Sequence, residues 1–205
     1  MIRTSVVDLA GCFIALLMVG FTGESQTARD PKALGSPLDP EKPGYEMSRL
    51  NEFAGNWGGE VKFCKEHGQG EKAKVGSTSR VDYGGFWLVS DCSVMTGKGP
   101  FREHSLLGYD QARQEYVLTT VNSMCSQLTV LRGSWDEELR QLILRGDATG
   151  PDRKPWHLTA IYSLGDEQHF GFSLIGSNDK IKDCPCVTIS FVRRDEAPPK
   201  HHPKE

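Results

Sequence analysis

Cysteine, histidine and acidic side chains are the residues of this chain that could act as nucleophiles, metal ligands or proton carriers. Cys92 and Cys125 are candidate catalytic thiols, although a reactive thiol needs an environment that lowers its pKa. His104 with Glu103 or Tyr109 is the candidate acid–base pair. Neighbouring residues on a strand point to opposite faces, so Glu103 and His104 cannot act together on one substrate.

A second group of possible ligands lies near the end of the chain. Cys184, Cys186, His201 and His202 could all bind a soft or borderline metal. Cys184-Pro-Cys186 lacks a second ligand pair at zinc spacing, and redox motifs usually place two residues between the cysteines. We favour a structural interpretation, a turn entering the last strand with one cysteine bridged to a neighbour. We therefore expect no metal and no cofactor.

Wider motifs and composition also favour a protein without catalytic activity. The sequence contains no G-x-S-x-G, H-E-x-x-H or phosphate-binding glycine loop. It has 24 basic and 27 acidic residues and an isoelectric point near 6.1. Nucleic-acid-binding domains usually carry a basic face and a high isoelectric point. We expect no nucleic-acid partner.

The first 27 residues have the pattern of a signal peptide. Arg3 precedes an apolar run over residues 9–21, and small residues follow. The run is shorter than the about 18–20 residues that a membrane helix needs. We expect export to the periplasm or beyond, with no membrane span after cleavage. Asp8 sits awkwardly near the start of the run, so an uncleaved membrane anchor is the alternative.

The rest of the chain divides into a spacer, one domain and a tail. Residues 28–46 carry four prolines among charged and small residues, which indicates a disordered spacer. Residues 195–205 have almost no apolar content and are expected to be disordered. Residues 47–194 have the length of a single domain.

That domain opens with a helical turn and continues as short strands. Met47, Leu50, Phe53 and Ala54 form one apolar helical stripe, which Gly55 ends. Alternating polar and apolar positions, separated by Gly, Pro, Asp and Asn, predict about ten strands. The predicted strands are 57–64, 75–83, 86–95, 101–109, 115–122, 127–135, 140–146, 156–163, 168–176 and 186–194.

Short connections between these strands predict an all-β fold with consecutive antiparallel pairing. A sheet of this length curls, and closure removes its edges. An up-and-down antiparallel barrel of about ten strands is the prediction, with a sandwich as the alternative. The helical turn should cover one end of it.

Alternation also suggests which side chains face the interior. The candidate pocket consists of Leu88, Ser90, Arg132, Tyr162 and Phe172. Arg132 continues the face of Leu128 and Val130, so it could bind a ligand carboxylate. The alternative places Arg132 at the solvent-exposed rim.

Several motifs, in order, resemble the DUF1579-type family of the calycin superfamily, which includes secreted bacterial proteins of undefined role. They are Leu50-x-x-Phe53-x-Gly55-x-Trp57-x-Gly59, the Gly-Gly-aromatic strand entry in residues 81–88, Leu107-Gly-Tyr-Asp110 with Tyr116, and Gly133-Ser-Trp-Asp136.

The resemblance implies a barrel like that of lipocalins or fatty-acid-binding proteins. It also implies that Gly55 and Trp57 form the barrel floor, with either Arg193 or Arg194 over the indole ring. Related nitrobindin-like barrels bind haem through a histidine, but no residue of this sequence matches the position of that histidine.

We therefore expect an exported lipocalin-like binding protein, monomeric or weakly associated, that holds a small, largely apolar ligand. The alternatives are a structural or interaction domain with a filled core, for which an exposed Trp87 or Trp135 would be the sign, or a haem-binding or calycin-type enzymatic barrel.

Overall fold

The computed structural model describes residues 42–63, 70–97, 99–150, 153–179, 181–182 and 184–194, all within one compact unit. The predicted signal peptide, the tail and nearly all of the spacer lie outside these residues. The first described element is helix α1 (Tyr45–Leu50), which continues into a 3₁₀ turn, η3 (Asn51–Phe53). The helix begins two residues before the predicted stripe and buries Met47 and Leu50, and η3 buries Phe53.

Ten strands follow the helix in the described chain, and each pairs antiparallel with the next. They are β1 (Gly55–Phe63), β2 (Lys72–Asp82), β3 (Trp87–Thr96), β4 (Gly99–Asp110), β5 (Glu115–Asn122), β6 (Thr129–Asp136), β7 (Gln141–Thr149), β8 (Pro155–Asp166), β9 (His169–Ser177) and β10 (Cys184–Arg193). A short 3₁₀ turn, η4 (Tyr83–Gly85), links β2 to β3.

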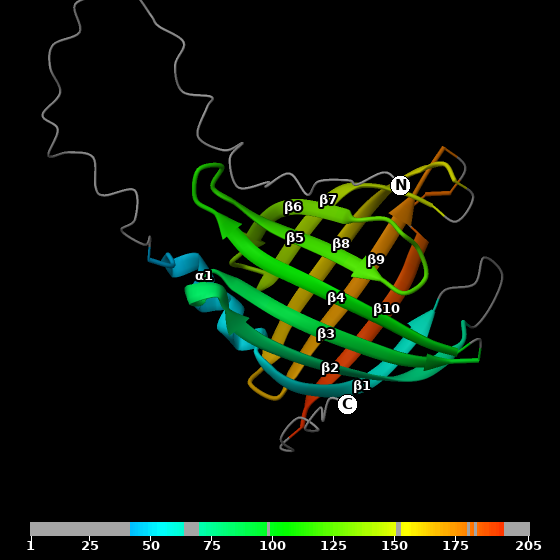
Figure 1. The fold of residues 1–205 in the computed structure, drawn as a ribbon, viewed down its shortest axis with the longest axis horizontal. Helices are drawn as coiled ribbons and strands as arrows, with labels where there is room; N and C mark the ends of the chain where they lie inside the picture. The colour runs from blue at the N-terminus through cyan, green and yellow to red at the C-terminus, as the bar shows by residue number, and fades with distance from the viewer. Residues whose placement is uncertain are drawn as a thin grey trace, which may run out of the picture. The chain divides into compact units, whose positions relative to one another are not determined.

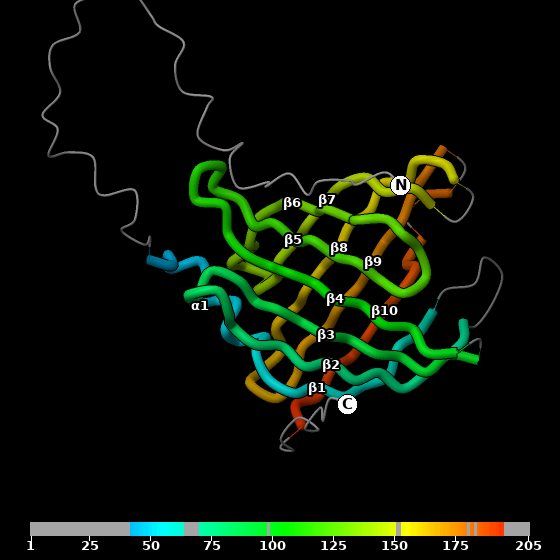
Figure 2. The backbone as a smooth tube through the Cα atoms, in the orientation of Figure 1, coloured from blue at the N-terminus to red at the C-terminus, as the bar shows by residue number. Residues whose placement is uncertain are grey.

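The sheet closes because β10 pairs with β1, which confirms the predicted up-and-down barrel. Figure 1 shows α1 at one end of the barrel. In Figure 2 the strands of the near and far walls cross in projection, as tilted strands of a closed barrel do. Closure leaves no free edge among the ten described strands, so each of them has a hydrogen-bonded neighbour on both sides.

A glycine permits close contact where the first and last strands meet. A Cβ atom on Gly59 of β1 would lie 2.1 Å from the carbonyl oxygen of Ser190 on β10. Any side chain there would push the two backbones apart, which explains why a residue with poor strand propensity occupies the strand interior.

The Cys184-Pro-Cys186 segment belongs to β10 and not to the turn before it. The register shifts between Pro185 and Val187, opposite β9. Such a bulge accommodates a proline, which has no amide hydrogen for the ladder.

Candidate functional site

The end of the barrel beside α1 is closed by a tryptophan. The side chain of Trp57 is only 1% exposed, and its indole nitrogen donates a hydrogen bond to the carbonyl of Phe53, 2.9 Å away. The ring also meets Phe170 at a right angle, with 4.7 Å between ring centres. Trp57 therefore ties the helical segment to the first strand and to the barrel wall.

The register selects Arg193, and not Arg194, as the arginine over this tryptophan. Arg193 lies directly opposite Trp57 in the β1–β10 pairing, and its guanidinium carbon is 4.2 Å from the ring centre. Its nitrogens donate to the carbonyls of Ala54 at 2.9 Å and Glu167 at 2.8 Å. Arg194 points to the outer face, where its side chain packs against Gly58.

Inward-facing residues near this end form a packed aromatic and aliphatic core. The ring centres of Phe53 and Tyr162 are 5.6 Å apart, and Phe170 stacks on Phe191 at 4.5 Å. The core also includes Leu50, Leu107, Leu142 and Leu144, all with essentially no exposed surface. This half of the interior is filled by protein.

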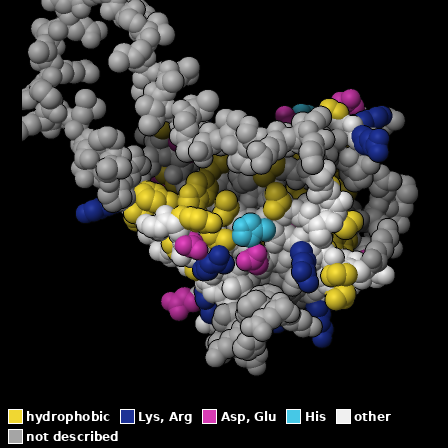
Figure 3. Space-filling view, viewed as in Figure 1, with side chains coloured by type: hydrophobic (Ala, Val, Ile, Leu, Met, Phe, Trp, Pro, Cys, Tyr) yellow, Lys and Arg dark blue, Asp and Glu magenta, His cyan; other side chains and the backbone are white. Residues whose placement is uncertain are grey.

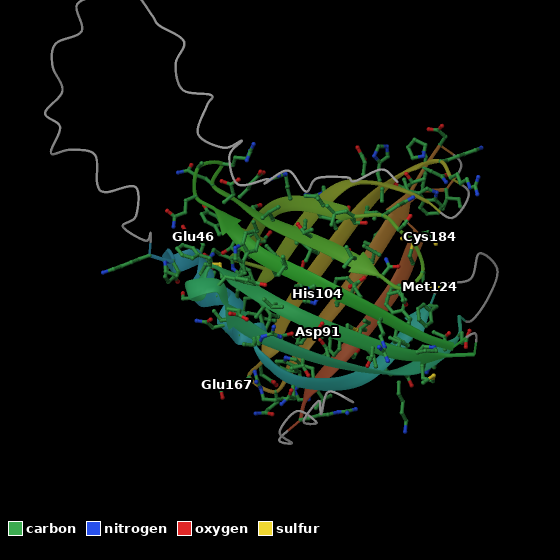
Figure 4. The ribbon with its side chains drawn as sticks, viewed as in Figure 1. Glu46, Asp91, His104, Met124, Glu167 and Cys184 are labelled. Atoms are coloured by element: carbon green, nitrogen blue, oxygen red, sulfur yellow. The ribbon has the colours of Figure 1, made fainter. Side chains whose placement is uncertain are left out.

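Toward the opposite end, inward-facing residues keep solvent-accessible surface. Partly exposed side chains that pack against the core include Phe63, Ala73, Cys92, Phe101, Leu158, Tyr162, Phe172, Leu174 and Val187. Tyr162 faces inward, opposite Leu142 and Phe172, and keeps accessible surface. Because the register points these side chains inward, their accessible surface lies on the inner side of the barrel wall. Figure 4 shows Met124 and Cys184 at this end and Glu46 at the other.

One acidic side chain faces this accessible half. Glu103 of β4 lies opposite Cys92 of β3 and Asn122 of β5, and it is partly exposed but largely enclosed by protein. Burial raises the pKa of its carboxyl to about 7. Within the described residues, no hydrogen bond or ion pair reaches this carboxyl.

Sequence reasoning did not place Glu103 in the pocket, although a signal was present. Phe101, Leu107 and Tyr109 alternate along the same predicted strand, and Glu103 has the same parity. Alternation alone therefore puts its side chain on the apolar face.

Two further ionisable groups lie near Glu103. Burial, and secondarily the Glu103 charge, raises the pKa of the Cys92 thiol to about 12. Burial, with smaller contributions from Glu103 and Cys92, also raises the pKa of the Tyr162 phenol. Both groups stay protonated at neutral pH, so Cys92 is a poor nucleophile. The arrangement supports hydrogen bonding to a ligand better than it supports thiol chemistry.

Four of the five predicted pocket residues face the interior, in two different settings. Leu88 is buried in the core, and Ser90 donates a hydrogen bond to the hydroxyl of Ser79 at 2.8 Å. Tyr162 and Phe172 lie side by side on β8 and β9, with ring centres 4.9 Å apart. Tyr162 and Phe172 border the accessible half, whereas Leu88 belongs to the filled one.

The inward position predicted for Arg132 is wrong. Leu131 is the residue of β6 that faces the core, so Arg132 lies on the outer face. There its guanidinium pairs with Glu115 at 2.9 Å. The prediction was displaced by one residue along the strand, and such a shift moves every side chain of the strand to the opposite face.

Three histidines lie on the outer surface, each beside an aspartate. The ring Nδ1 of His104 is 2.8 Å from Asp91 across β4 and β3, and Figure 4 shows the two side by side. His157 with Asp147 and His169 with Asp166 form the other pairs. In Figure 3 a histidine lies among acidic and basic side chains, with hydrophobic side chains gathered beside them. None of these three histidines faces the interior.

The described residues contain no group of three or more histidine, cysteine or acidic side chains that could hold a metal ion. His201 and His202 of the considered metal site lie outside them.

A shallow groove of about 340 Å³ lies near the closed end, on β8, β9 and β10. Its small outward-facing residues Ser163, Gly171 and Ser190 lie side by side on the three strands.

The two tryptophans considered as signs of an interaction surface are only partly exposed. Trp87 packs across Gly108, and the Trp135 indole donates to Glu137 at 3.1 Å.

No helix within the described ranges is long and apolar enough to cross a membrane. Comparison with curated proteins gave no match. The sequence matches the family described as "Protein of unknown function (DUF1579)" over residues 42–193, and the chain therefore belongs to this family.

Proposed function

We propose that this chain is an exported, calycin-like binding protein that holds a small, largely apolar ligand in the half of its barrel away from α1. The supporting observation is the contrast between the two halves of the interior. Core residues beside α1 have essentially no exposed surface, whereas Tyr162, Phe172, Leu174 and Val187 face inward and keep accessible surface. Pockets of this kind, mostly apolar with few polar groups, are typical of small-molecule sites.

The accessible half has the composition that such a ligand requires. Aromatic and aliphatic side chains form most of its wall, and Glu103, Cys92 and Tyr162 supply the polar groups. A barrel of eight to ten strands is wide enough to hold one small ligand. A domain with a filled core is the alternative, and the accessible surface in the half away from α1 is what favours a ligand site.

A neutral fluorescent probe tests this proposal. N-phenyl-1-naphthylamine should bind the purified protein with saturable 1:1 stoichiometry and a blue-shifted emission. Leu174→Trp adds bulk to an inward position, so it should abolish most of the binding. Ile175→Trp, on the outer side of the same strand, is the matched control and should bind normally. Equal binding by both variants, or none by the wild type, would contradict an interior site.

Export is tested separately, by fractionation and N-terminal sequencing of the chain made in a bacterial host. A mature chain that begins near residue 28 in the periplasm or medium supports cleavage. An intact N-terminus in the membrane fraction supports the anchored alternative.

A further inference from the structure

Few charged side chains face the barrel interior, and they differ in whether they are free to contact a ligand. Among inward-facing positions of the described strands, Glu103 is the single acidic residue and Arg193 the single basic one. The remaining charged side chains of the described strands, such as the Arg132–Glu115 pair, lie on the outer face of the barrel. Glu103 is therefore the single charged residue of the described strands that faces the accessible half, since Arg193 lies at the closed end.

Arg193 cannot serve as a receptor for an anionic ligand. Its guanidinium donates to the carbonyls of Ala54, Glu167 and, at 3.4 Å, Glu52, and it lies over Trp57 at the closed end. These contacts use three of its five N–H donors and hold the guanidinium at the closed end, away from the accessible half. A fatty-acid anion in the accessible half would find no free cation on the described strands, and it would be repelled by the Glu103 carboxylate.

Glu103, in contrast, is an acceptor that has no counter-charge among the residues that the structure describes. Its neighbours across the strands are Cys92 and Asn122, and the amide oxygen of Asn122 already accepts a hydrogen bond from the backbone of Met124. Burial without a cation raises its pKa to about 7. A cationic group beside the carboxylate would offset this desolvation, because an opposite charge favours the ionised form.

The surroundings of Glu103 complete a site for an amphiphile. Tyr162 faces the same interior as Glu103, and its ring meets Phe172 edge-to-face. Leu174 and Val187 pair directly across β9 and β10, and both are partly exposed on the inner wall. Aromatic faces near a carboxylate favour an ammonium ion, and the aliphatic wall suits a hydrocarbon body.

We propose that Glu103 is the recognition residue for the ligand's polar end, and that this end is a protonated amine attached to an apolar body that lies against Phe172, Leu174 and Val187. This inference rests on the proposed function, since it names the class of ligand for the same interior site. It predicts selectivity opposite to that of a site built for fatty acids.

Three probes with the same hydrocarbon chain test the inference: decylamine, decanol and decanoate. Each is titrated into the protein at pH 8 by calorimetry, below its micellar concentration. Decylamine should bind most tightly and decanoate most weakly. Glu103→Gln should weaken decylamine binding by about tenfold or more, as expected when one partner of a buried charge pair is removed, and should strengthen decanoate binding.

Glu60→Gln is the matched control. Glu60 lies on the outer face of β1 and pairs with Lys72, so the variant changes the net charge equally without touching the interior. Its affinities should equal those of the wild type. The inference is overturned if decanoate binds as tightly as decylamine, or if Glu103→Gln leaves the affinity for decylamine unchanged; the interior site itself would survive that result. Binding of none of the three probes would remove the interior site and this inference together.

Discussion

Arg193 lies directly opposite Trp57 across the seam between the last and first strands, with its guanidinium carbon 4.2 Å from the indole centre. The same arginine holds carbonyls of the helical segment and of the β8–β9 turn. One side chain therefore links three parts of the closed end that are far apart in the sequence.

Arg193→Ala should lower the free energy of unfolding by about 2–4 kcal/mol, because it removes a cation–π contact and hydrogen bonds from a charged donor. Arg194→Ala is the control, and as a surface change it should stay within about 0.5 kcal/mol of the wild type. Urea unfolding followed by tryptophan fluorescence measures both. Similar losses for the two variants would contradict the distinct role of Arg193.

Trp57→Ala should cost roughly 3–5 kcal/mol, as for other buried aromatic residues. Trp57→Phe keeps most of the apolar volume but loses the hydrogen bond to Phe53, so it should lie between the alanine variant and the wild type. The melting midpoint by circular dichroism gives the order. An unchanged midpoint for the alanine variant would exclude Trp57 from the floor.

Gly59→Ala should destabilise the barrel by about 1–3 kcal/mol, the usual range for overpacking. The added methyl group would meet the Ser190 carbonyl oxygen on the neighbouring backbone at 2.1 Å. Gly76→Ala on β2 is the matched control, since its nearest contact, the Ser93 hydroxyl, is 3.9 Å away. Urea midpoints compare the two, and equal midpoints would argue against the close approach of β1 and β10.

The raised pKa of Glu103 predicts that stability falls as the pH rises. The pKa is about 7 in the folded chain against an ordinary value of 4.5. Below pH 4.5 the carboxyl is protonated in both states, so its contribution is fully present there. That contribution decreases above pH 4.5 and is lost once the pH passes about 7, a total of about 3 kcal/mol at most.

Urea unfolding at several pH values between 4 and 8 measures this decrease. Glu103→Gln has no carboxyl to ionise, so its curve should be flatter over the same range. If the two curves run parallel, the slope comes from other groups.

Cys92 should react slowly with alkylating reagents in the folded protein. The pKa of its thiol is raised to about 12 by burial and by Glu103, and the thiolate is the reactive form. Cys125 is exposed and should be alkylated by iodoacetamide at least about tenfold faster at pH 8. Peptide mapping by mass spectrometry follows each site, and concentrated urea should equalise the rates. Equal rates without urea would contradict the protected position.

Alternation in the sequence was sufficient for the number and the order of the strands. The predicted fifth strand, 115–122, has the same limits as β5, and most other limits differ by a few residues. Local hydrophobic period and turn residues carry this information, because each strand has one face toward the core and each connection is short.

The sequence left open which face of a strand points inward where apolar residues occur on both faces. Leu128 and Val130 share the parity of Arg132 and suggested that this face points inward, yet Leu131 is the residue that packs against the core. Pairing with β5 places Leu131 opposite Leu118 and settles the phase. The sequence of one strand cannot specify this, because both phases bury apolar side chains.

The sequence by itself determined a closed antiparallel barrel with a helical cap, since these follow from local patterns repeated along the chain. Only the tertiary structure decided that Arg193 covers Trp57, and that Glu103 faces the same interior as Tyr162. Both relationships depend on the register across strands that are distant in sequence, and closure of the barrel sets that register through many weak contacts at once.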